Sequence, residues 1–341
     1  MKIPLYVLLC GVVIAGLLST SLLIGLLSDD YSRKAIIALA HHQIAELHTQ
    51  VQTHAKTYLG EAAQTIDTYA LAMSMDDESS NSTEFHRRFL LEQMKFLPTY
   101  YDETYFGATD NQWWGMTGPT YATGITFHVR NIPDVFSTKP SIPPNCNVTL
   151  PIFENYPNLS KDGYTKNWTC EWKNFNATGR PWYLLISTDP QLYTHRDRKA
   201  WTDSYIYAAV SGVTGVVGYT IARAAWRNDT FLGVCAVDVT AKFLNQYLAM
   251  LPDLTAHTLL FIMDNKGMMV ASSNTQLPLA TKDANGDDQP MYASQYPEPR
   301  VRDIHAMFGS TQTNGVVVAT LNDQNHFVII TQVDATGQER M

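Results

Sequence analysis

Arg180, Trp182 and Tyr183 are the first residues of this chain whose types and spacing suggest chemistry. They lie in "GRPWYLLIST", residues 179–188, a segment whose other residues suit burial. An arginine buries poorly without an anionic partner, because its guanidinium stays charged and presents a planar fork of donors. Arg180 therefore either reaches water from the start of a helix or holds a cation ready for something anionic.

Asp238 is the acidic counterpart, since it interrupts an apolar strand pattern between Val237 and Val239. A carboxylate in such surroundings needs a cationic or hydrogen-bonding partner. Two interpretations are open: Arg180 and Asp238 pair with each other, or both bind a ligand. The aromatic residues around them favour the ligand, because aromatic walls exclude water and contact cations through their faces.

Catalytic signatures are absent from the sequence. There is no GxSxG elbow, no GxxxxGK[ST] loop and no HExxH motif. The segment "SGVTGVVG", residues 211–218, has glycines but lacks the lysine of a phosphate loop, and a turn explains it. Acidic pairs such as Asp102-Glu103 and Asp287-Asp288 are expected in solvated loops. The chain is therefore predicted not to be an enzyme and to use no cofactor.

No metal site is predicted either. No cysteine and histidine spacing suggests one, and the clustered histidines of the N-terminal third are explained by exposed helix positions; these are His41, His42, His48 and His54.

Length and charge limit the broad class. The 341 residues suffice for one large or two ordinary domains. The formal net charge of −8 and the lack of a basic run argue against a nucleic-acid partner.

The N-terminus has the pattern of a membrane span. Residues 3–28 carry no charged side chain and are mostly Leu, Val, Ile, Gly or Ala. This stretch is long enough to cross a bilayer and longer than the apolar part of a cleavable signal peptide. Cleavage near the small residues Ser19-Thr20 is the alternative. Lys2 before it and Asp29-Asp30 after it favour an orientation in which the rest of the chain is extracellular, at the plasma membrane.

Glycosylation sequons and cysteines agree with that compartment. Six sequons within residues 81–228 are typical of a secretory-pathway protein; their asparagines are Asn81, Asn147, Asn158, Asn167, Asn176 and Asn228. Cys146 and Cys170 flank the sequon-rich part, so a disulfide between them is predicted in an oxidising compartment. Cys235, in an apolar strand pattern, is expected to be a buried, inert thiol.

The order of elements predicts an α+β chain. Residues 33–75 form one long amphipathic helix of roughly 60 Å. Shorter helices are predicted at 84–96, 241–250 and near 301–308. Hairpins are expected about residues 109–111, 227–229 and 322–323, and one with Gly267 in a left-handed turn. A Pro-punctuated, glycosylated insertion covers 133–178.

This order, with the strings "YFGATDNQWWGMTG", "RPWYLLI", "SYIYAAVSG", "LGVCAVDVT" and "LLFIMDNKGMMVASS", resembles the double-Cache sensor domains of membrane receptors and chemoreceptors. The resemblance implies a stalk helix and two stacked Cache (PAS-like) modules with antiparallel sheets. The implied divisions are a transmembrane signal anchor at 1–30, the long helix at 31–75, a membrane-distal module at 76–252 and a membrane-proximal module at 253–341.

The resemblance also implies a ligand site in the distal module. In amino-acid-binding members an aromatic residue, an arginine and a tryptophan hold the ligand carboxylate, and a tyrosine with two aspartates holds its ammonium. Tyr207 stands here where one of those aspartates is expected, and Asp203 is more consistent with an outward-facing loop residue. The implied binding residues of this chain are Phe175, Arg180, Trp182, Tyr183, Tyr205, Tyr207 and Asp238.

The sequence thus predicts the extracellular sensing region of a membrane receptor, whose ligand is an amino acid or a related small carboxylate or amine. The long helix offers a possible homodimer contact. A cell-surface interaction protein or channel auxiliary subunit that uses Cache modules as a scaffold is the alternative, and a membrane-anchored ectoenzyme is a third reading.

Overall fold

A computed structural model describes residues 5–75, 82–96, 103–117, 125–130, 152–156, 167–170, 176–207, 216–251, 258–264, 266–308, 315–321 and 324–330. The chain divides into two compact units. One joins Met1–Thr53 with Gln312–Gln332, and the other joins His54–Thr311 with Val333–Met341. The domain boundaries drawn from the sequence stay a prediction.

Among the residues whose positions are described, no helix is both long enough and apolar enough to cross a membrane.

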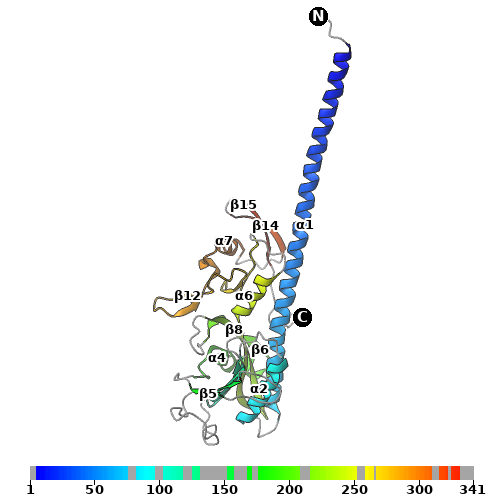
Figure 1. Ribbon diagram of the computed structural model, residues 1–341. Coiled ribbons are helices and arrows are strands. Elements are labelled where there is room, and N and C mark those ends of the chain that lie inside the picture. Colours follow the sequence, from blue (N-terminus) through cyan, green and yellow to red (C-terminus); the bar gives the residue numbers. More distant parts are fainter. Residues whose placement is uncertain are drawn as a thin grey trace. The chain divides into compact units, whose positions relative to one another are not determined.

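Helices and antiparallel strands alternate along the chain, as the sequence predicted (Figure 1). The described helices, including one short 3-10 helix, are α1 (Leu5–Ser74), α2 (Thr83–Phe96), α4 (Pro181–Thr188), α5 (Pro190–Thr194), α6 (Ala241–Met250), η2 (Ala293–Gln295) and α7 (Pro299–Phe308). Those predicted from 84, 241 and 301 are confirmed to within two residues at their starts.

One antiparallel sheet dominates the second unit. Its order in the described residues is β5-β4-β3-β2-β1-β9-β8-β6, and β7 also pairs with β8. The strands are β1 (Glu103–Ala108), β2 (Trp113–Thr117), β3 (Ile125–Arg130), β4 (Ile152–Tyr156), β5 (Asn167–Cys170), β6 (Lys199–Trp201), β7 (Tyr205–Ile206), β8 (Val217–Arg227) and β9 (Thr230–Thr240). The predicted insertion therefore contributes β4 and β5 to the sheet.

Three two-stranded sheets complete the described strands. Two belong to the second unit: β10 (Phe261–Met263) with β11 (Met269–Ser272), and β12 (Ala280–Lys282) with β13 (Asp288–Pro290). In the first of these hairpins Gly267 has a φ of 78°, which confirms the predicted left-handed turn. The third pairs β14 (Gly315–Leu321) with β15 (Gln324–Ile330) and belongs to the first unit.

The turn between β8 and β9 fits the hairpin predicted there. Asn228 and Asp229 have φ values of 44° and 66°, the left-handed pair that a tight hairpin with right-twisted strands requires. Arg227 pairs with Thr230 at the hairpin end.

A β-bulge interrupts this hairpin after only two residue pairs. Trp226 lies opposite Phe231 but Ala225 lies opposite Gly233, so Leu232 is the extra residue on β9. Gly233 has a φ of 152°, and a Cβ there would lie 2.1 Å from the carbonyl oxygen of Gly107. Only glycine lets β9 approach β1 this closely, and the bulge resets the register of every later pair.

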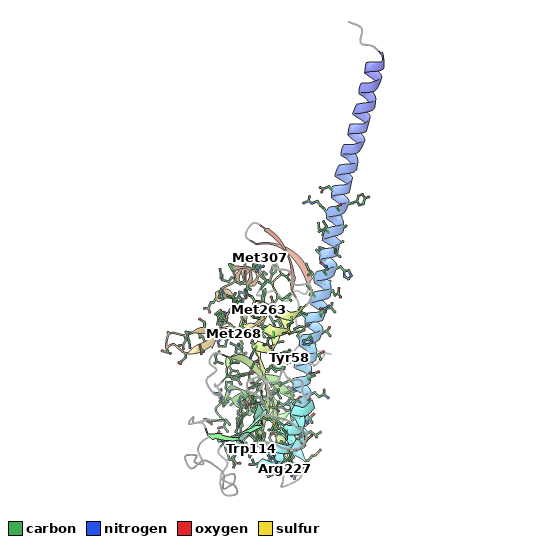
Figure 2. The ribbon with its side chains drawn as sticks, in the orientation of Figure 1. Tyr58, Trp114, Arg227, Met263, Met268 and Met307 are labelled. Carbon is green, nitrogen blue, oxygen red and sulfur yellow. The ribbon has the colours of Figure 1, made fainter. Side chains whose placement is uncertain are left out.

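Helix α1 covers the sheet face opposite to α4 with its buried stripe, which includes Tyr58, Ile66, Tyr69 and Met73. Asp67 of α1 binds Lys199 of β6 and Arg223 of β8, each at 2.5 Å. Arg227 of β8, which is labelled in Figure 2, also donates to the carbonyl oxygen of Met73 at 3.3 Å. Because these cations come from adjacent strands, Asp67 ties two strands to one helix.

Helix α6 packs on α1 through aromatic rings. The ring of His54 stacks on Tyr247 with centroids 3.8 Å apart, and Tyr58 contacts Phe243 at 4.8 Å. The predicted exposed position is therefore wrong for His54, because a tertiary contact covers this turn of α1. Burial lowers the pKa of His54, and the charge of Glu61 opposes that shift.

His86 of α2 is fully buried in an aromatic stack on the same sheet face. Its ring lies 4.1 Å from Trp114 and 5.3 Å from Phe106, measured between centroids. Its Nδ1 lies 2.8 Å from the hydroxyl of Tyr69. Burial lowers the pKa of His86 to about 3, so the imidazole is neutral near neutral pH.

Gly233→Ala should reduce the free energy of unfolding by about 3 kcal/mol or more, because the new methyl group collides with the β1 backbone at a φ that side chains avoid. Gly286→Ala is the matched control: Gly286 also has a positive φ, of 87°, but its Cβ position is open. The control should lose only roughly 1 kcal/mol. Equal losses in urea unfolding would show that the close approach to Gly107 is unimportant.

The neutral burial of His86 predicts an acid-labile fold. Its folded pKa of about 3 lies below the ordinary 6.5, so between these values only the unfolded chain takes up the proton. Stability should fall by about 1.4 kcal/mol for each pH unit lost in that window. His86→Gln should remove this part of the slope in urea titrations, whereas His195→Gln, at an exposed site, should not. An unchanged slope in His86→Gln contradicts the assignment.

Candidate functional site

A hydrogen-bonded network surrounds the carboxylate of Asp238, which is only 6% exposed. The hydroxyls of Tyr105 and Thr220 each donate to its Oδ1 at 2.6 Å. The hydroxyl of Tyr205 lies 2.6 Å from that of Thr220. Thr220 uses its one proton on Asp238, so Tyr205 is the donor to Thr220. We call Tyr105, Tyr205, Thr220 and Asp238 the Asp238 network.

The sheet register brings these residues together. Asp238 of β9 lies directly opposite Thr220 of β8 and Glu103 of β1. Residues directly opposite each other on antiparallel strands point to the same face, and so does Tyr105, two residues after Glu103. The site face of the sheet is therefore the one that α4 covers, away from α1.

Tyr205 connects the acidic and basic sides of the site. Burial raises its pKa well above the ordinary value, and the charge of Asp238 raises it further. The hydrogen bond with Thr220 and the positive charge of Arg180 oppose this shift. The charges of Asp238 and Arg180 therefore act on the pKa of Tyr205 in opposite directions.

Arg180 is half-buried and stands at the N-cap of α4, before Pro181. A tight turn places it there, because its backbone N–H donates to the carbonyl oxygen of Ala177 at 3.1 Å. The side chain of Asn111, from the β1–β2 turn, accepts from the N–H of Ala177 at 2.7 Å. The β1–β2 hairpin thus fixes the approach of Arg180 to the sheet.

Trp182 forms the packed wall of the site at 2% exposure. Its ring meets that of Tyr105 nearly edge-on, with centroids 4.9 Å apart. A Cβ on Gly107 would come within 2.5 Å of the indole, so the absent side chain of β1 makes room for it. Tyr183 packs on Trp182 and Phe231 instead of joining the Asp238 network.

Tyr207 supports the strands with its hydroxyl. That hydroxyl donates to the carbonyl oxygen of Tyr219 at 2.6 Å and accepts from the N–H of Val239 at 3.1 Å. Its ring lies against Gly218, where a Cβ would come within 2.3 Å, and 5.1 Å from the ring of Tyr205. In place of the expected carboxylate, the chain has a phenol that joins β7, β8 and β9.

Several predicted positions lie outside the described residues or side chains. Phe175, Cys146, Asn81, Asn147 and Asn158 are not described, and for Asn167 and Cys170 only the strand is. The predicted Cys146–Cys170 disulfide therefore stays a prediction. Asn176 and Asn228 are exposed, as glycan acceptors must be, and Cys235 is a buried free thiol, as expected.

Sequence reasoning missed Tyr105, Thr220 and Glu103. The expectation of a solvated loop is wrong for Glu103, because it begins β1 and is half-buried opposite Asp238. Strand alternation in "ETYFGA" could have grouped Glu103 with Tyr105. The outward position expected for Asp203 is confirmed: it is exposed and pairs with Lys266 at 2.6 Å.

In the comparison with known proteins, the chain is similar to solved structures alone, and the similarity concerns the fold. No family model matches the chain, and no curated protein matches it. One similar structure is the ligand-binding domain of the Pseudomonas aeruginosa amino-acid chemoreceptor PctC in complex with GABA. It is 13% identical, covers 86% of this chain and 93% of that chain, and has a TM-score of 0.43.

Two further solved structures are similar to the chain. The ligand-binding domain of P. aeruginosa PctB in complex with L-Gln is 13% identical over 86% of this chain and 85% of that chain, with a TM-score of 0.47. Methyl-accepting chemotaxis protein X is 12% identical over 87% and 94%, with a TM-score of 0.49. At these identities and TM-scores, the function is argued from the residues of this chain alone.

Tyr105→Phe should lower the free energy of unfolding by about 1.5 to 3 kcal/mol, because Asp238 loses a donor while it stays buried. Tyr183→Phe is the matched control, since both rings pack on Trp182 but only that of Tyr105 serves Asp238. The control should change stability by less than about 0.5 kcal/mol. Urea unfolding of both variants measures the difference, and similar values would contradict the role given to Tyr105.

Proposed function

We propose that the site face binds a small zwitterionic or charged molecule, and that the chain is the sensing region of a membrane receptor. One observation carries the proposal: Arg180 begins α4, whose Trp182 packs in one aromatic cluster with Tyr105 and Tyr205 of the Asp238 network. A cation and an anion are thus associated with the same aromatic cluster. Such an arrangement complements a ligand that carries both charges.

The chemistry of binding follows from the groups present. Arg180 offers two parallel N–H donors to a carboxylate, and Asp238 offers acceptor oxygens to an ammonium. The rings of Trp182 and Tyr205 line the site, and their faces are apolar and attract cations. The ligand is therefore an amino acid or a related small carboxylate or amine.

The proposed receptor consists of the segments that the sequence predicts. Residues 3–28 form the membrane span, the chain beyond them is extracellular, and a distal module at 76–252 and a proximal one at 253–341 are Cache modules. The six sequons carry glycans and Cys146 bonds to Cys170. Exposed apolar residues of α1 support a homodimer contact along the long helix; these are Tyr31, Ile36, Ile37 and Leu39. Ligand binding would bias this dimer between two states.

The function can be tested by measuring the melting temperature of the full chain in the presence of amino acids, amines, small carboxylates and nucleobases. One class of compound should raise the melting temperature, because a ligand that binds only the folded chain stabilises it. At a ligand concentration of one hundred times the dissociation constant, this stabilisation is about 2.7 kcal/mol. Arg180→Ala and Asp238→Asn should abolish the shift, because each removes one charged contact. Arg196→Ala should keep it, since Arg196 is exposed and lies over Trp226 at the far hairpin end.

Three outcomes would overturn this function. A shift that survives both Arg180→Ala and Asp238→Asn places the ligand elsewhere. Binding to a protein partner alone, indifferent to Arg180→Ala, indicates an interaction protein. Turnover of the ligand indicates an ectoenzyme.

A further inference from the structure

Strand β7 contacts two hydrophobic cores of the second unit through adjacent residues. Tyr205 packs against the core that contains Trp182, which we call the first core. Ile206, the next residue, packs against a core that contains Met269 and Met291, which we call the second core. Successive side chains of a strand point to opposite faces, so two neighbouring residues of β7 link the two cores.

The two residues before β7 bind the hairpin of β10 and β11, which is part of the second core. The hydroxyl of Ser204, a buried residue, donates to the sulfur of Met268 at 2.9 Å. Met268 is labelled in Figure 2. Asp203 pairs with Lys266 of the hairpin turn at 2.6 Å. Both members of that ion pair are exposed, so solvent screens it, whereas the contact of Ser204 with Met268 is more protected.

Four consecutive residues thus have separate anchors, and we call residues 203–206 the connector. Three of its side chains bind the second core or its hairpin. The fourth, that of Tyr205, binds the Asp238 network, because its hydroxyl donates to that of Thr220 at 2.6 Å. A peptide bond joins Tyr205 to Ser204, so loosening the Tyr205 anchor also loosens the hold of Ser204 on Met268.

The connector can shift more readily than the centre of the sheet. Among the described strands β7 pairs only with β8, through Tyr205 with Gly218 and Ile206 with Val217. Strands β8 and β9, in contrast, pair along their whole length. A short strand with one paired edge opens at a lower free-energy cost than the middle of a long hairpin. A disturbance at the Asp238 network is therefore more easily taken up by the connector than by β8 and β9.

We propose that the connector couples the Asp238 network to the second core, so that loss of the hydrogen bond between Tyr205 and Thr220 weakens the β10–β11 hairpin. The contact between Ser204 and Met268 carries this coupling. The coupling is a property of the fold and needs no ligand, so it does not rest on the proposed binding role. A molecule that engaged Tyr205 would nevertheless alter the second core.

Residue-resolved amide hydrogen exchange of the full chain tests the coupling. The reporter is the N–H of Met269, which donates to the carbonyl oxygen of Met291 at 2.9 Å. Tyr205→Phe keeps the ring and removes the hydroxyl. It should raise the exchange rate of this amide at least about twofold relative to the amides at the centre of β8 and β9, which report unfolding of the whole unit.

Three variants show whether the effect travels through the connector. Tyr183→Phe is the matched control, because it removes a phenol hydroxyl from the first core outside the connector, and it should leave the relative rate unchanged. In a Ser204→Ala background, Tyr205→Phe should no longer raise the Met269 rate. Met268→Leu removes the sulfur but keeps a similar volume. It should give the same result as Ser204→Ala and serves if that variant does not fold.

Several results would overturn the coupling. One is an unchanged Met269 rate in Tyr205→Phe, and another is an equal rise at Met269 and at the centre of β8 and β9, which indicates a global loss of stability. A rise of the same size in Tyr183→Phe, or one that persists in the Ser204→Ala and Met268→Leu backgrounds, also excludes the connector. Arg180-dependent ligand binding is tested separately by melting, so failure of either proposal leaves the other standing.

Discussion

The close approach of β9 to β1 at Gly233 is the constraint on which the site depends. The bulge next to it adds one residue to β9. Every later residue of β9 is therefore shifted by one position relative to its partner on β8. Without it, Asp238 would not lie opposite Thr220. On the other edge of β9, the pairing with β1 runs without a shift from Gly233 to Asp238, so Glu103 lies opposite Asp238 and Tyr105 is on the same face. The Asp238 network thus depends on the registers of three strands, and the bulge sets that of β8 with β9.

Strand β8 serves both faces of the sheet. Thr220 belongs to the Asp238 network on one face, and Arg223, three residues on, binds Asp67 of α1 on the other. Lys199, opposite Arg223 on β6, binds the same carboxylate. The two cations would repel each other without Asp67, so the helix and strands are held as one body. A ligand that shifts β8 would therefore also displace Arg223 relative to Asp67 of α1.

Much of the fold could be predicted because turns and helix ends depend on local chemistry. The β8–β9 turn and the α6 helix follow from local sequence. The site was only partly predictable: Arg180 and Asp238 stand out as charges in apolar segments, but their neighbours depend on register. Counting back from the turn at 228–229 places Tyr219, not Thr220, opposite Asp238, and only the bulge corrects this. His54 likewise could not be placed without the tertiary contact that covers it.

The cost of burying Asp238 explains why the hydroxyl groups around it are ordered. A buried carboxylate is stable only with donors in place, and here two hydroxyls converge on one oxygen while Tyr205 orients the hydroxyl of Thr220. The strands fix these donors, so their arrangement needs no reorganisation on binding. A ligand of the kind proposed would therefore meet a network that is already in place, which reduces the ordering cost of binding.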